Sequence, residues 1–96
     1  MDERRRSPRA DIRCGCTLVR SAGTPVAAET LDLGPTGMCV RSQRPLMVDE
    51  VLRFELEIGA GGLARVMRQD AGRRYAMRFE QLADDARSEL LRLASA

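Results

Sequence analysis

The stretch "VLRFELEIGAGG", residues 51–62, decides the fold class of this chain. Apolar side chains at Leu52, Phe54, Leu56 and Ile58 alternate with charged ones, which is the period-two pattern of a strand with one buried face. The closing "GAGG" is typical of a tight connection to another strand. It lacks the Lys-Ser/Thr pair that completes a phosphate-binding P-loop, so a hairpin turn is the better interpretation.

Short segments of the same kind lie on both sides of this stretch. Each alternates or is rich in aliphatic residues, and turn residues such as "SAGTP" at 21–25 separate them. We expect these strands at 12–19, 26–33, 38–42, 63–68 and 74–79. In the second of them, we expect Leu31 and Leu33 to face one way and Thr30 and Asp32 the other.

The last segment of the chain has a different period. Leu82, Ala86, Leu90 and Leu93 recur at spacings of three and four, which predicts an amphipathic helix of roughly three turns over about 83–94. Short strands followed by one helix favour an all-β fold, a small antiparallel barrel with a C-terminal helix packed over it. Packing of the leucine stripe on the barrel is the default, and dimerisation through it is the alternative.

Composition excludes several classes of function. The 96 residues fit one domain, and a net charge of +2 with only 3% aromatic residues argues against nucleic-acid binding. The sequence has no apolar run that would span a membrane and no apolar leader, so we expect a cytoplasmic protein.

The absence of histidine excludes Ser-His and Cys-His nucleophile pairs, so we expect no enzyme. Cys14, Cys16 and Cys39 lack C-x-x-C spacing and make a poor zinc site, so no metal or cofactor is expected. We expect all three to be reduced and to act as small buried apolar residues.

The basic residues are all arginine, and several of them crowd the N-terminus. Residues 1–9, "MDERRRSPR", are polar throughout and are expected to form a flexible arm preceding a domain at 10–96. Arginine suits planar, bidentate contact to phosphate, whereas the plainer interpretation is a solvated basic tail.

Two motifs, taken together, carry a resemblance to a known family. Arg5-x-x-x-Arg9 precedes the first strand, and Asp32-x-Gly-x-x-Gly37 ends the second. The pair resembles the PilZ domain family, whose members bind the bacterial second messenger cyclic di-guanylate (c-di-GMP). The resemblance covers nearly the whole chain and implies a six-stranded antiparallel barrel followed by a helix. Without the arginines, "DLGPTG" would be read as an ordinary turn.

The resemblance implies a role for each motif residue. Arg5 and Arg9, with Arg4 as a third contact, would pair with phosphate or guanine and stack on a base. Asp32 would accept hydrogen bonds from the guanine N1–H and amino group. Gly37 would supply a position that needs positive φ or close approach to the ligand.

This chain departs from the family pattern at Gly34, where the family has serine. A lost hydroxyl contact amounts to about 0.5–3 kcal/mol, which corresponds to about two- to hundredfold weaker binding. A second departure lies near Met67, where relatives often have an aromatic residue.

Two functions are therefore expected from the sequence. The first is a c-di-GMP receptor or adaptor, monomeric or weakly dimeric, whose arginine arm folds over the nucleotide and signals to a protein partner that the sequence does not name. The alternative is a PilZ-fold protein-interaction module whose nucleotide binding is weak or lost because of Gly34.

Overall fold

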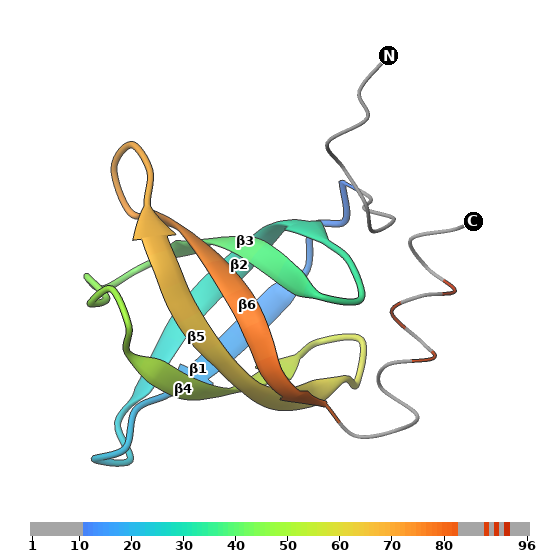
Figure 1. Cartoon of the computed structure of the whole chain (residues 1–96), viewed down its shortest axis with the longest axis horizontal. Coiled ribbons are helices and arrows are strands. Elements are labelled where there is room, and N and C mark those ends of the chain that lie inside the picture. Colours follow the sequence, from blue (N-terminus) through green and yellow to red (C-terminus); the bar gives the residue numbers. More distant parts are fainter. Residues whose placement is uncertain (1–10, 83–87, 89, 91, 93–96) are drawn as a thin grey trace.

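Six antiparallel strands form a closed barrel in the order β1-β2-β3-β6-β5-β4 (Figure 1). The computed structural model describes residues 11–82 together with Ser88, Leu90 and Arg92. The strands are β1 (Gly15–Val19), β2 (Pro25–Leu33), β3 (Gly37–Ser42), β4 (Val51–Leu56), β5 (Gly61–Gln69) and β6 (Arg74–Leu82). The six-stranded antiparallel barrel predicted from the sequence is confirmed.

The alternation in β4 fills the barrel interior as predicted. Leu52, Phe54 and Leu56 are buried, and the ring of Phe54 stacks on that of Phe79 with centroids 5.0 Å apart. The prediction was wrong for Ile58, whose side chain is 39% exposed. The strand ends earlier because Gly59, at φ 105°, turns the chain and donates a hydrogen bond to the carbonyl of Leu56.

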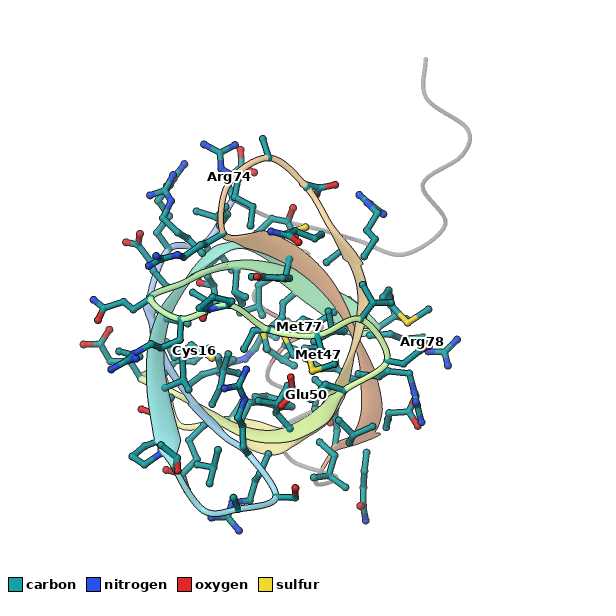
Figure 2. All side chains as sticks on the ribbon, turned by 90° about the vertical axis from the view of Figure 1, so that its left-hand side faces the viewer. Cys16, Met47, Glu50, Arg74, Met77 and Arg78 are labelled. Carbon is teal, nitrogen blue, oxygen red and sulfur yellow. The ribbon has the colours of Figure 1, made fainter. Side chains whose placement is uncertain are left out.

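Strand β6 separates its side chains between the two sides of the wall. Viewed along the barrel, Met77 lies in the interior with Cys16, whereas Arg74 and Arg78 project outward (Figure 2).

Burial raises the pKa of the Cys16 thiol to about 12, so this cysteine is protonated at neutral pH. The expectation of a small buried residue is confirmed there.

One buried hydroxyl fixes the connection between β3 and β4. The backbone N–H of Leu46 donates to the hydroxyl of Tyr75, with N and O 2.9 Å apart, and both residues are buried. A polar tip on an otherwise apolar ring is satisfied in this way without opening the core.

The predicted C-terminal helix is described at three positions. Ser88, Leu90 and Arg92 are helical, and Leu90 is buried. The rest of the predicted helix over 83–94 lies outside the described residues, as does the arm predicted over 1–9. Across residues 11–82 and those three positions, no helix has the length and apolar character needed to cross a membrane.

Candidate functional site

A β-bulge in β2 places Asp32 on the outer surface of the barrel. Thr30 pairs with Val40 of β3, but the next pair along is Asp32 with Cys39, so Leu31 is an extra residue. The bulge reverses the alternation of β2. Thr30 and Leu33 are therefore both buried, and the prediction that Thr30 shares a face with Asp32 was wrong.

The connection from β2 to β3 carries the two motif glycines and is tied to β6. The N–H of Gly34 donates to the carbonyl of Gly37 at 3.0 Å, and the N–H of Phe79 donates to the carbonyl of Thr36 at 2.9 Å. Both glycines are buried. The motif loop is thus a hydrogen-bonded part of the barrel wall.

Gly37 is explained by the neighbouring strand. Its φ lies outside the left-handed region, so positive φ, the first of the two expected reasons for glycine, is wrong, and close approach to the ligand stays a prediction. A Cβ at this position would collide with the carbonyl oxygen of Met77 and would lie 3.4 Å from the Cα of Arg78. Gly37 allows β3 and β6 to approach each other closely, whatever else it contacts.

Asp32 lines a hollow of about 300 Å³ on the outer wall. Its lining combines three guanidinium groups and three carboxylates, contributed by β2, β3, β6 and the segments before β1 and β6. The lining residues are Asp11, Arg13, Leu31, Asp32, Cys39, Arg41, Asp70 and Arg74. Such a lining offers donors to phosphate and acceptors to a base edge within one space.

Neighbouring charges restrain part of this lining. Asp70 is paired with Arg68 across 3.0 Å, and the hydrogen bond and charge of Asp70 raise the pKa of Arg68. Arg41 lies 3.9 Å from Glu29, and both side chains are about half exposed. An exposed pair at that distance is weak, so Glu29 holds the Arg41 side chain only loosely.

A second hollow of about 780 Å³ adjoins the first. The two share Arg41 and Arg74, and the second also includes Arg73 and the outward face of β2 near Glu29. Arg41 and Arg74 therefore stand between two spaces on the outer wall, and a ligand in either space would meet both guanidinium groups.

The structure describes three of the six predicted site residues. Arg4, Arg5 and Arg9 lie outside the described residues. Asp32 lines the hollow, while Gly34 and Gly37 shape the adjoining loop.

Sequence reasoning missed three arginines of the hollow, Arg13, Arg41 and Arg74. In "MCVRS" and "RRYAMRF" the neighbours of Arg41 and Arg74 face inward, so the alternation puts both arginines on the outer face of the barrel. This pattern could have indicated their position from the sequence. Cys39 faces the hollow too and is only half-buried, so the expectation of a buried apolar residue was wrong there.

Met67, where an aromatic residue was noted for relatives, is 42% exposed on β5. Within residues 11–82 and the described helical positions, no three cysteine or acidic side chains gather as a metal-binding group.

The described residues thus form a closed antiparallel barrel with a charged hollow on its outer wall. The chain belongs to the PilZ domain family, whose model matches residues 3–96. No curated protein matches the chain.

Two solved structures share the fold at low sequence identity. The Bacillus subtilis inhibitor of motility, MotI/DgrA, superimposes with a TM-score of 0.82 at 15% identity over 98% of this chain. This chain spans 51% of that protein. The PilZ domain of YcgR from Escherichia coli, solved with c-di-GMP, gives 0.76 at 16% identity, covering 97% of this chain and 90% of that one.

Proposed function

We propose that this chain is a c-di-GMP receptor that acts by binding rather than by catalysis, in the bacterial cytoplasm where a second messenger is made and read. The observation that carries the proposal is the hollow at Asp32, which Arg13, Arg41 and Arg74 line together with the motif carboxylate of a PilZ barrel. The YcgR domain, a barrel of the same fold, was solved with this nucleotide.

The lining suits both chemical parts of the nucleotide. Asp32 accepts from the N1–H and amino group of guanine, which a carboxylate does well because it is an acceptor only. Arg41 and Arg74 pair with a phosphate, where a charge-assisted, bidentate contact is roughly twice as strong as a neutral hydrogen bond.

Chain length places the arm within reach of this hollow. Arg9 is three residues from Ile12, so its Cα lies within about 10 Å of that residue. Asp11 and Arg13, on either side of Ile12, already line the hollow. In this proposal residues 1–9 form the arm of a barrel domain at 10–96, and Arg4, Arg5 and Arg9 fold across the bound nucleotide.

The arm is expected to become ordered when the nucleotide binds. Amide hydrogen exchange at residues 4–9 should be fast in the free protein and at least several-fold slower at saturating c-di-GMP, because new contacts fix the backbone. Exchange at buried Val40 serves as the internal control and should stay slow throughout. Equal protection of the arm with and without nucleotide would rule out arm closure as the output to a partner protein.

Replacing Gly34 with serine should restore the hydroxyl of the family motif. Gly34→Ser is expected to bind c-di-GMP about two- to hundredfold more tightly, because a hydroxyl contact contributes about 0.5–3 kcal/mol. Isothermal titration of both proteins measures the difference. Ser21→Gly, a change in the exposed turn between β1 and β2 and outside both motifs, is the control and should leave the affinity unchanged. A weaker Gly34→Ser variant that remains folded would contradict the missing-hydroxyl argument.

Gly34 is also the observation that favours a second function, a PilZ-fold interaction module with little nucleotide affinity. In that case a protein partner would contact the outer wall without c-di-GMP. The titration of wild type separates the two functions, since the module gives no saturable heat with c-di-GMP. Heat with Gly34→Ser alone would show that Gly34 is what removes the binding.

A further inference from the structure

Thr30 connects two segments that the proposed nucleotide site needs side by side. Its side chain is completely buried, and its hydroxyl donates to the carbonyl of Ile12 at 2.6 Å. The same oxygen accepts from the N–H of Cys14 at 2.9 Å. The backbone N–H of Thr30 adds a third contact, donating to the carbonyl of Cys14 at 2.9 Å.

These contacts begin where the regular ladder ends. The last paired residues of β1 and β2 are Gly15 and Glu29, and residues 12–14 precede β1. A hydroxyl serves here as both donor and acceptor for a segment outside the strand. In Figure 1 the blue segment before β1 accordingly runs beside the start of the β2–β3 connection.

Thr30 also lies at the bulge that turns Asp32 outward. It is two residues from Asp32 on one side and, through Ile12, bonded to a point three residues from Arg9 on the other. The Thr30 side chain therefore links residues 12–14, which follow the arginine arm in the chain, to the strand that carries the motif carboxylate.

We propose that Thr30 is a positioning residue for c-di-GMP binding, a latch that fixes the root of the arm (residues 12–14) against β2. This inference rests on the proposed receptor function. With these hydrogen bonds made, the barrel itself fixes the chain from Ile12 onward. Without them, binding must also fix the residues up to Gly15, and ordering those additional residues weakens binding.

A purely structural role makes a different prediction. Thr30→Val keeps the side-chain shape but leaves the Ile12 carbonyl and the Cys14 N–H without their side-chain partner, which lowers stability in either case. Only a latch acting through the arm makes the effect on affinity depend on Arg9, because coupled residues are non-additive.

The test is a double-mutant cycle read by isothermal titration with c-di-GMP, using wild type, Thr30→Val, Arg9→Ala and the double variant. Thr30→Val is expected to bind about three- to tenfold more weakly than wild type, in the range of one lost hydrogen bond. Thr30→Ser, which keeps the hydroxyl, should stay within about twofold of wild type. In the Arg9→Ala background, Thr30→Val should change the affinity by less than about twofold.

An insertion of two glycines between Ala10 and Asp11 gives a second route that leaves Thr30 intact, should Thr30→Val fail to fold. It lengthens the chain between the arginine arm and residues 12–14 and should also weaken binding. Unchanged affinity in Thr30→Val or in the insertion, or full additivity with Arg9→Ala, would overturn the inference while leaving the receptor proposal in place. No heat with wild type and Gly34→Ser alike would overturn the receptor proposal and the inference together.

Discussion

Arg9→Ala is expected to weaken c-di-GMP binding by about five- to 150-fold, which corresponds to the loss of about 1–3 kcal/mol typical of one bidentate arginine contact. Arg9 is the motif arginine nearest the described barrel, three residues from Ile12, and so the one whose reach toward Asp32 is most restricted. Titration calorimetry at fixed ionic strength measures the change, because charge contacts weaken as salt rises.

Arg53→Ala is the matched control, since it removes the same charge from an exposed position on β4. It should leave the affinity within about twofold of wild type, because an exposed charge away from the site is screened by solvent. Arg74→Ala, which removes a guanidinium from the hollow, should resemble Arg9→Ala. Equal effects of Arg53→Ala and Arg9→Ala would mean that only net charge matters and would remove the case for a defined site.

Gly37→Ala is expected to lower the free energy of unfolding by about 3 kcal/mol, at the upper end of the range for overpacked positions. The added methyl would meet backbone atoms of Met77 and Arg78, which no side-chain rotation can relieve. For a domain of this size the melting temperature should fall by about 12–24 °C. Thermal unfolding followed by circular dichroism measures this loss without any ligand.

Gly15→Ala is the control for that experiment. Its Cβ would meet only the flexible side chain of Glu57, at 3.4 Å, and its backbone lies outside the left-handed region. The melting temperature should therefore change by only a few degrees. If Gly37→Ala were as stable as Gly15→Ala, the close approach of β3 to β6 would not be what requires glycine there.

The barrel could be predicted from the sequence because its strands keep the simple period of two. The alternation of Leu52, Phe54 and Leu56 specifies a buried face in β4 whatever the neighbouring strands are. Ile58 continues the same pattern in the sequence but lies past the turn at Gly59, and alternation alone does not mark where a strand ends.

The bulge in β2 could not be read from the sequence. Thr30, Leu31 and Asp32 fit an unbroken alternation, and the extra residue appears only in the pairing of β2 with β3. For the same reason the collision that requires glycine at position 37 was hidden, because it involves a carbonyl about forty residues further along the chain.

The candidate site was predicted only where it is local in the sequence. Asp32, Gly34 and Gly37 form one short motif, whereas Arg41 and Arg74 reach the hollow from two other strands. Residues brought together by barrel closure leave no spacing to recognise in the sequence. Arginines that face outward from neighbouring strands become part of a site only once the strand order is known.

The central claim is that this PilZ barrel binds c-di-GMP, and direct calorimetric titration of the unmodified chain tests it. The expected result is saturable heat with c-di-GMP. Cyclic di-adenylate should bind much more weakly. It has the same phosphates, but it lacks the guanine N1–H from which Asp32 would accept a hydrogen bond. The absence of heat at high micromolar c-di-GMP, in wild type and Gly34→Ser alike, would contradict the claim.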